Sequence, residues 1–363
     1  MNSLDHDLAS LFCVGFRGTS PSPEVLELIR RGVYGVILFA RNVVDAEQVA
    51  ALVAELKRAA GRPLLVSIDQ EGGRVARLRA PQGFTELPPM RAVGATGDAA
   101  LAREVGALLG RELRAVGIDQ DYAPVVDVDT NPANPVIGDR SFARDPAAVA
   151  RLGVALAQGL QSAGVAACAK HFPGHGDTSQ DSHKDLPRLP HALERLRAIE
   201  LVPFRALAAG GVASVMTAHV VFDALDPARP ATLSAPVMRL LRDECGYDGC
   251  VISDDLEMKA VAEHFPLEEA VPSALAAGVD ALLVCHEATV QHRAIDLARR
   301  AVETGAVSRE RLAQARARVD RLLTWAGPAP DAAAARAVLR SETHLALAAR
   351  VPALATGSDP TAA

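Results

Sequence analysis

Residues 165–177 read VAACAKHFPGHGD, and this stretch decides the fold that we expect. Its first five residues, 165–169, form a short apolar run, which is typical of a strand buried on both faces. Lys170 and His171 follow where that strand ends, and a loop rich in glycine and histidine comes next. Long loops of this kind on a rigid scaffold tend to carry function. The stretch therefore predicts a parallel strand whose carboxyl end carries polar chemistry.

The same alternation of a short apolar run and a helical stretch continues along the chain. The strand-like runs are 11–16, 35–39, 64–68, 120–126, 165–169, 214–217, 250–253 and 281–285. The helical stretches are 23–31, 45–60, 98–116, 146–163, 193–209, 235–245, 267–277, 288–300 and 308–325. This alternation predicts a closed (β/α)8 barrel of the TIM type as a single domain over residues 1–325. We expect residues 326–363 to form an Ala/Pro-rich linker, a short helix over 336–350 and a frayed tail.

An open, doubly wound sheet is the alternative fold from this pattern alone. Its first strand-to-helix turn would favour a glycine-rich phosphate loop. Residues 15–18, Gly-Phe-Arg-Gly, are a poor version of such a loop, so the barrel is the fold that we expect.

The composition excludes several classes of protein. With 38 basic and 44 acidic residues the net charge is −6, which argues against nucleic acid as the main partner. No apolar stretch reaches the length of a membrane span and the first residues lack the pattern of a signal peptide, so we expect no membrane partner. The five cysteines are scattered and fit no zinc spacing. We therefore expect a cytoplasmic monomer without cofactor or metal.

Charged or imidazole groups follow several predicted strands at their carboxyl ends. Besides Lys170, Asp69 opens the segment DQEGGRVAR after the run 64–68, His219 follows the run 214–217, and Asp254 follows the run 250–253. In a barrel the carboxyl ends of the strands meet on one face, where the active site is built. We expect these groups to share one site.

The spacing of the acidic residues and histidines indicates acid–base and nucleophilic chemistry. Asp181 and His183 are two positions apart, so the carboxylate can orient an imidazole that serves as general acid and general base near neutral pH. Metal binding and a purely structural loop are the alternatives. Asp254 and Asp255 point to opposite faces of an extended strand, so one can face the mouth as a nucleophile while hydrogen bonds fix the other. Capping of the next helix is the alternative for either carboxylate.

Taken together, these motifs resemble glycoside hydrolase family 3, in its β-N-acetylhexosaminidase branch. Residues 170–177 with 181–183 are similar to the loop motif of that branch, and 253–258 to its nucleophile motif. Residues 69–77 and 139–142 are similar to two further motifs, in the family's order, and the likeness covers residues 8–350. The resemblance implies a (β/α)8-type barrel and a retaining exo-β-N-acetylglucosaminidase.

The resemblance also implies a role for each matching residue. Asp254 matches the nucleophile, His183 the acid/base and Asp181 its partner, although retaining glycosidases normally use two carboxylates. The residues that match the binding site for the terminal N-acetylglucosamine are Asp69, Arg77, Arg140, Lys170 and His171. The implied substrate is a small carbohydrate, a muropeptide with N-acetylglucosamine β-1,4-linked to 1,6-anhydro-N-acetylmuramic acid. The implied process is the recycling of cell-wall peptidoglycan.

Three other functions remain open at this point. A β-N-acetylglucosaminide phosphorylase would use phosphate instead of water, and phosphate meets less repulsion from an imidazole than from a carboxylate. A β-glucosidase of the same family is less favoured, since that branch typically lacks the Gly-His-Gly-Asp-Thr loop. A non-catalytic sugar-binding protein is disfavoured because Asp254, His183 and Asp181 are all present.

Overall fold

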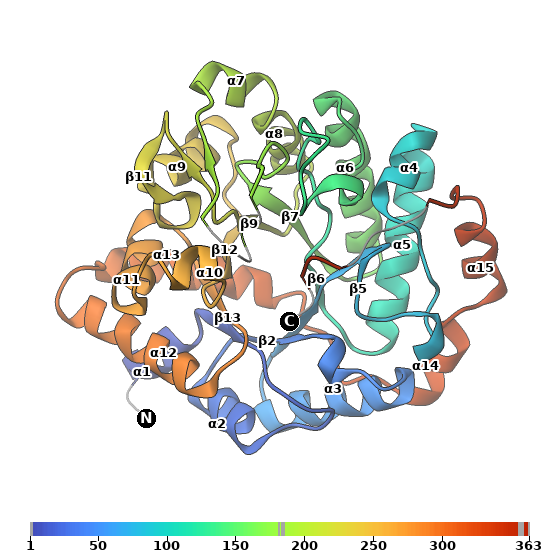
Figure 1. The fold of residues 1–363 in the computed structure, drawn as a ribbon. Helices are drawn as coiled ribbons and strands as arrows, with labels where there is room; N and C mark the ends of the chain where they lie inside the picture. The colour runs from blue at the N-terminus through green and yellow to red at the C-terminus, as the bar shows by residue number, and fades with distance from the viewer. Residues whose placement is uncertain (1–2, 181, 183–185, 355–358, 362–363) are drawn as a thin grey trace.

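A computed structural model describes residues 3–180, 182, 186–354 and 359–361 of the chain. In these residues, eight parallel strands close into a barrel in the order β1–β2–β3–β6–β7–β9–β12–β13, with β13 returning to β1 (Figure 1). The barrel strands are β1 (Phe12–Val14), β2 (Gly35–Leu38), β3 (Leu65–Ile68), β6 (Gln120–Asp121), β7 (Ala166–Phe172), β9 (Ser214–Thr217), β12 (Cys250–Asp255) and β13 (Ala281–Val284). The predicted (β/α)8 barrel is confirmed.

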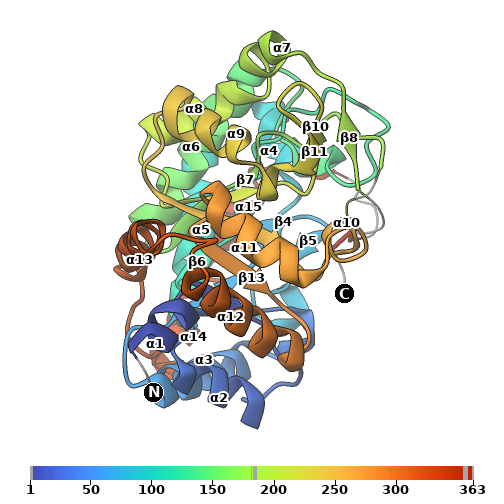
Figure 2. The same cartoon turned by 90° about the vertical axis from the view of Figure 1, so that its left-hand side faces the viewer.

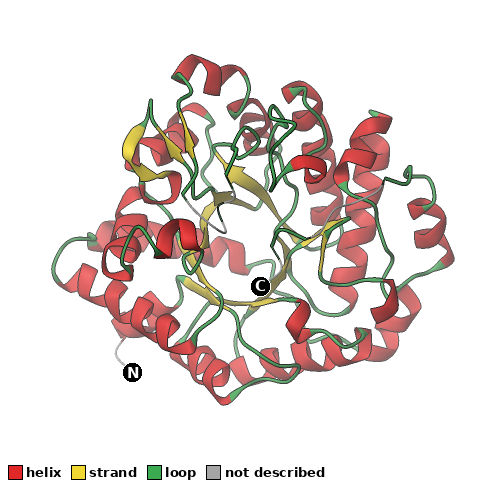
Figure 3. Cartoon of the chain, viewed as in Figure 1, coloured by secondary structure: helices red, strands yellow, loops and turns green. Residues whose placement is uncertain are grey.

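Helices surround the barrel on its outside, as the colouring by secondary structure makes clear (Figure 3). They are α1 (Ser3–Ala9), α2 (Pro23–Arg31), α3 (Ala46–Ala60), α4 (Met90–Thr96), α5 (Ala99–Ala115), α6 (Pro146–Ser162), α7 (Leu193–Ala198), α8 (Leu201–Ala209), α9 (Ala235–Arg239), α10 (Lys259–Ala262), α11 (Leu267–Ala277), α12 (Ala288–Glu303), α13 (Arg309–Leu323), α14 (Ala332–Val338) and α15 (Glu342–Ala348).

Small sheets are added at one end of the barrel. The hairpin β4 (Gln70–Gly72) and β5 (Val75–Ala76) follows β3 directly, and β8 (Arg188–Leu189), β10 (Val221–Phe222) and β11 (Asp226–Pro230) form a second sheet. Seen from the side, both sheets and α10 lie at the same end of the molecule (Figure 2). This end is the one reached by the carboxyl ends of the barrel strands.

Local sequence explains where a typical unit begins and ends. The strand β2 reads Gly-Val-Ile-Leu and is fully buried, because helices cover one face and the barrel interior covers the other. Helix α3 begins after Asp45, whose carboxylate accepts a hydrogen bond from the backbone N–H of Gln48 at 2.8 Å. It ends at Gly61, which has the left-handed φ of 60° that glycine adopts without cost.

Element boundaries differ from the expected ones for identifiable reasons. The expected strand 120–126 has only Gln120–Asp121 in the ladder, because Pro124 has no N–H to donate and the later pairing is a single bridge. The strands β7 and β12 instead run on to Phe172 and Asp255, which places the polar groups on the strands themselves. The expected helix 193–209 is broken into α7 and α8, since Pro203 is tolerated only in the first turn of a helix.

The chain after residue 326 packs back on the barrel. Helices α14 and α15 stand where the sequence predicts one helix over 336–350, and Arg340 between them has a φ of 51°. The buried carboxylate of Glu112 on α5 holds this turn, since it accepts hydrogen bonds from the Arg340 N–H at 2.9 Å and from the ring of His344. Among the helices that the structure describes, none combines the length and the apolar character that a membrane span requires. The cysteines in the described part of the chain are buried and free.

A buried ion cluster closes the opposite end of the barrel. The carboxylate of Asp119, which is fully buried, accepts hydrogen bonds from the Lys57 ammonium at 2.8 Å and the Arg114 guanidinium at 2.5 Å. It also accepts from the backbone N–H groups of Val66 and Gly327. One carboxylate thus ties β3, α3, α5 and the start of the C-terminal segment together.

We predict that Asp119→Ala lowers the free energy of unfolding by about 3–5 kcal/mol, because it leaves the buried Lys57 ammonium without its counter-charge. Urea denaturation followed by circular dichroism measures this loss. The matched control is Asp248→Ala, which removes a carboxylate that is 74% exposed and pairs with Arg318 at 2.8 Å. That change should cost less than about 1 kcal/mol. Equal losses in the two variants would contradict the role of Asp119.

Candidate active site

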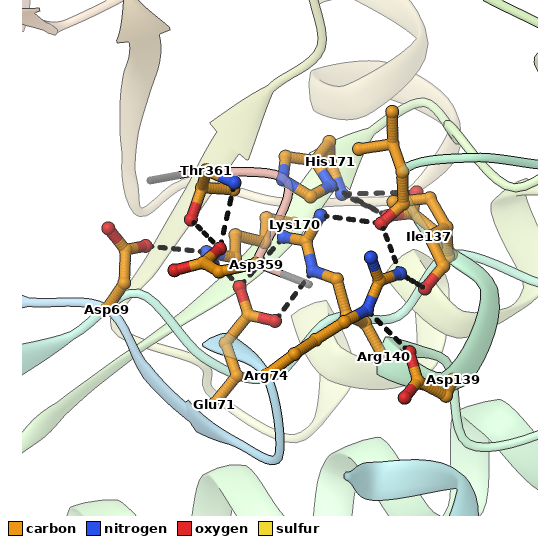
Figure 4. A network of polar contacts seen from close by, with 12 residues as sticks. Asp69, Glu71, Arg74, Ile137, Asp139, Arg140, Lys170, His171, Asp359 and Thr361 are labelled. Atoms are coloured by element: carbon orange, nitrogen blue, oxygen red, sulfur yellow. Dashed lines mark hydrogen bonds and ion pairs between the residues drawn. The ribbon is translucent and has the colours of Figure 1, made fainter. Parts of the chain in front are cut away.

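A network of buried charges lies at the carboxyl ends of the strands (Figure 4). The ammonium of Lys170, on β7, is 2.8 Å from Asp69 Oδ1 and 2.6 Å from Glu71 Oε1. The guanidinium of Arg140 makes a bidentate pair with Glu71, with both distances at 2.8 Å. Arg77 Nη2 lies 3.4 Å from Asp69 Oδ2. The strand β7, the hairpin β4–β5 and the 3-10 turn Gly138–Arg140 are held together by these pairs.

Each charge in this network is maintained by its neighbours. Burial alone would raise the pKa of the Glu71 carboxyl, but Arg140 and Lys170 hold it well below its usual range. Burial would likewise lower the pKa of Lys170, but Asp69 and Glu71 raise it above its usual value. The pKa of Asp69 is lowered in the same way, because Lys170 and Arg77 outweigh its burial. The mouth therefore presents fixed cations and carboxylates at neutral pH.

A second buried carboxylate, Asp127, organises the histidines. Its Oδ2 is 2.7 Å from Nδ1 of His171, and its Oδ1 accepts the backbone N–H of His175 at 2.6 Å. Burial acts to raise the pKa of Asp127, but the neighbouring His171 lowers it below its ordinary value. Because Asp127 engages Nδ1 of His171, Nε2 is the ring nitrogen that can interact with a ligand in the pocket.

The adjacent carboxylates on β12 have different surroundings. Asp254 borders the pocket, and its Oδ1 accepts the backbone N–H of Asp255 at 2.8 Å. Oδ1 of Asp255 instead accepts N–H groups from Glu257 and Cys285, and its Oδ2 is 3.1 Å from Nε2 of His286. Hydrogen bonds thus fix Asp255, while Asp254 faces the cavity.

The structure brings the predicted site residues that it describes into one pocket. Those that line it are Asp69, Arg77, Arg140, Lys170, His171 and Asp254. The predicted acid/base pair, Asp181 and His183, lies outside the described residues, but Ser182 between them also lines the pocket. Apolar walls come from Phe39, Met216 and Met258. No group of three or more histidine, cysteine or acidic residues among the described part of the chain could hold a metal ion.

Residues from the C-terminal segment also reach this pocket. Arg77 Nη1 is 2.6 Å from Asp359 Oδ2, and its Nη2 donates to Thr361 Oγ1 at 2.7 Å. Asp359 and Thr361 are labelled in Figure 4. Thr361 is one of the pocket's lining residues. The Asp359 carboxylate therefore occupies one donor group of Arg77, a residue that the sequence predicts to bind the sugar.

Sequence reasoning did not single out Glu71, Asp127 or His175. Asp127 follows directly after the expected strand 120–126, so the strand-end rule that selects Asp69 and Asp254 could have found it. Glu71 and His175 stand inside quoted motifs, but nothing in the spacing shows which partners they meet. Their roles follow only from the ion pairs and hydrogen bonds.

Comparison with known proteins agrees with this geometry. Residues 3–322 match the glycosyl hydrolase family 3 N-terminal domain. A β-hexosaminidase from Thiobacillus denitrificans is 45% identical over 289 residues, which are 78% of this chain and 79% of that protein. The chain therefore belongs to glycosyl hydrolase family 3.

Solved structures indicate which branch of the family this chain resembles. A family 3 β-N-acetylglucosaminidase from Paenibacillus sp. str. FPU-7 superposes with a TM-score of 0.90 at 43% identity, covering 97% of this chain and 68% of that one. NagZ from Neisseria gonorrhoeae, solved in complex with N-trifluoroacetyl-D-glucosamine, gives a TM-score of 0.79 at 34% identity over 94% and 96% of the two chains. The expected resemblance to the β-N-acetylhexosaminidase branch is confirmed.

We predict that Asp127→Asn lowers kcat/KM by about 10–100-fold, because a hydrogen bond to a charged partner contributes about 1.5–3 kcal/mol. The substitution preserves shape but removes the charge that orients His171, so the pH profile of kcat/KM should also shift. Hydrolysis of an aryl β-N-acetylglucosaminide measures both effects.

The matched control is Asp129→Asn, two positions further along. Asp129 is buried and pairs with Arg91 at 2.7 Å but is not among the residues that line the pocket. This variant should retain the wild-type pH profile. An unchanged rate and pH profile in Asp127→Asn would show that His171 does not depend on this carboxylate.

Proposed function

We propose that this glycoside hydrolase is a retaining exo-β-N-acetylglucosaminidase. The observation that carries the proposal is the position of Asp254, whose carboxylate borders the pocket while its neighbour Asp255 is fixed by hydrogen bonds. A nucleophile needs this combination of exposure to the substrate and a rigid support. The names of the relatives support N-acetylglucosamine as the sugar that is released.

The buried charge network supplies a binding site for one sugar ring. Sugar hydroxyls both donate and accept hydrogen bonds, and the pocket offers a carboxylate acceptor in Asp69 and cationic donors. The cationic donors are Arg77, Arg140 and Lys170, and the imidazole of His171 adds a further polar group. Because the network holds the groups rigidly, little ordering is needed when the sugar binds. Buried polar groups left without a partner would also disfavour a sugar that lacks the matching hydroxyls.

The proposed reaction has two steps. In the first, an oxygen of Asp254 attacks the anomeric carbon while the glycosidic C–O bond breaks and protonated His183 gives its proton to the leaving oxygen. Asp181 stabilises the imidazolium in this role. In the second, neutral His183 takes a proton from water, and the water oxygen attacks the anomeric carbon and releases Asp254. Two inversions give net retention of the β configuration.

We further propose that the physiological substrate is a muropeptide, with 1,6-anhydro-N-acetylmuramic acid as the aglycone, and that the enzyme is a cytoplasmic monomer of peptidoglycan recycling. A single-domain barrel with its pocket open at the strand ends suits removal of one terminal sugar. We also propose that residues 326–363 form a C-terminal extension of this catalytic domain.

We predict that the protein releases N-acetylglucosamine from the anhydro-muropeptide disaccharide and from an aryl β-N-acetylglucosaminide, with the β anomer formed first. Product analysis by NMR measures both. Asp254→Ala should reduce kcat/KM by at least about 1000-fold, since nucleophile and base act as a unit. Added azide should restore turnover in that variant and yield the α-azide, because the small anion enters where the carboxylate stood.

The same assay separates the alternatives. Release of a sugar 1-phosphate that depends on added phosphate would identify a phosphorylase, and faster cleavage of an aryl β-glucoside would identify a β-glucosidase. Binding of the disaccharide without turnover would contradict an enzymatic function. Hydrolysis with inversion would contradict the role of Asp254.

A further inference from the structure

His286 follows the last barrel strand, β13, and lines the pocket together with Asp254. Its Nε2 is 3.1 Å from Oδ2 of Asp255, the residue next to the proposed nucleophile. The side chain of His286 is 25% exposed and also borders an adjoining hollow between the loop after β1 and the start of α12. Neither His286 nor Asp255 takes part in the two proposed reaction steps, so the pair serves a purpose other than bond cleavage.

A β-bulge brings two carboxylates to the pocket at the end of β12. The strands β12 and β13 pair at Ile252 with Ala281 and again at Asp255 with Leu283, so β12 has one residue more than its partner between these points. Alternation along a regular strand would turn Asp255 away from Asp254, but with the extra residue both line the pocket. Two like charges that share one cavity oppose each other's ionisation.

The segment after β13 supports the carboxylates at the end of β12. Oδ1 of Asp255 accepts the backbone N–H of Cys285 at 3.2 Å. The carboxylate of Glu257 accepts two further backbone N–H groups of this segment, at 2.6 and 3.1 Å. These N–H groups carry no net charge. The His286 imidazole, in contrast, can bring a full positive charge to Asp255.

The surroundings of His286 favour its charged form. The contact with Asp255 raises the pKa of His286 above its ordinary value, and Glu257 acts in the same direction. Burial and the Arg41 guanidinium oppose this rise without cancelling it. The other described charged groups that border the ring come from its own loop and from the segment after β1, where an ion pair joins the first two: Glu287, Arg17 and Glu24.

The ring of His286 is also held in place by packing. It lies against Phe39, with 5.7 Å between the ring centroids and 32° between the planes. The guanidinium of Arg41 lies 4.2 Å from the centroid of the Phe39 ring and donates to the carbonyl oxygen of Cys285 at 2.8 Å. On the other side of the contact, the carbonyl oxygen of Asp255 accepts from Nε2 of His219 at 2.9 Å. Both members of the pair are thus anchored independently of each other.

We propose that His286 is a positioning residue, whose imidazolium balances the charge of Asp255 and holds its carboxylate aside, so that Asp254 is the ionised carboxylate that attacks the sugar. The inference rests on the proposed function and adds to it the residue that sets the charge of the nucleophile. His286 acts through Asp255 and makes no contact with the reacting atoms.

The pH dependence of the first reaction step tests this. The leaving group of 2,4-dinitrophenyl β-N-acetylglucosaminide departs without a proton, so the low-pH limb of kcat/KM follows ionisation of the nucleophile. A cation near a carboxylate lowers its pKa, and removing the cation raises it again, by about one unit at short range. In His286→Gln, which keeps a donor for Asp255 but no charge, the limb should therefore move up by about one pH unit.

Matched variants separate the charge from the hydrogen bond. His286→Lys restores a cation and should return the limb towards its wild-type position. His292→Gln removes a histidine on α12 that contacts Arg31 and is not among the residues that line the pocket, so its limb should match the wild type. The charged groups and histidines that other strands and loops contribute to the described pocket wall are unchanged in these variants: Asp69, Arg77, Arg140, Lys170, His171 and His175.

An NMR titration tests the ion pair without relying on activity. The ring Cε1–H signal of His286, assigned by its loss in His286→Gln, should titrate above the unperturbed value of about 6.5. In Asp255→Asn the same signal should titrate at lower pH, because the carboxylate that favours the imidazolium is gone.

The outcomes are distinct. An unmoved low-pH limb in His286→Gln, or the same limb in His286→Lys as in His286→Gln, overturns the role of His286, and so does a His286 signal that is indifferent to Asp255→Asn. If the wild type cleaves no aryl β-N-acetylglucosaminide, or if Asp254→Ala keeps the wild-type rate, the proposed function itself fails, while the NMR titration still reports on the pair. Circular dichroism and thermal unfolding separate these results from misfolding.

Discussion

The mutual compensation of buried charges at the barrel mouth is the constraint on which the rest of the site depends. Removing a carboxylate or an ammonium from water costs several kcal/mol, and a partner at hydrogen-bonding distance offsets this cost. Lys170, at 3% side-chain exposure, meets this condition through Asp69 and Glu71. Glu71 meets it through Arg140 as well. The neighbours of each group favour its charged form against the effect of burial, so the charges support one another.

This interdependence also positions the chain. Glu71 lies on the hairpin β4–β5, Arg140 on the 3-10 turn after β6 and Lys170 on β7, so the pairs fix separate loops at one place. Asp127 adds a second support through His171 and His175. From there the hydrogen bonds continue to Ser182 and Ala260, and so to the segment after the nucleophile strand. The sugar site and the nucleophile are thereby parts of one connected polar framework.

The fold and much of the site could be predicted from the sequence because both follow short-range rules. Apolar runs mark the barrel strands, and the residues at their carboxyl ends share one face, which selects Asp69, Lys170 and Asp254. The sequence does not show which charged residues pair with one another. That Glu71 pairs with Arg140 and Lys170 depends on loops far apart in the chain, and no local pattern encodes it. The contact of Asp359 with Arg77, across 282 positions, is hidden for the same reason.

In the proposed mechanism, Asp254 forms a covalent bond to the sugar while Asp255 only supports it. Incubation with a 5-fluoro-N-acetylglucosaminyl fluoride, followed by proteolysis and mass spectrometry, tests this most directly, since the fluorine slows release of the glycosyl group. We expect one glycosyl adduct per chain, attached to Asp254. Turnover without an adduct, or an adduct on Asp255 or another residue, would contradict it.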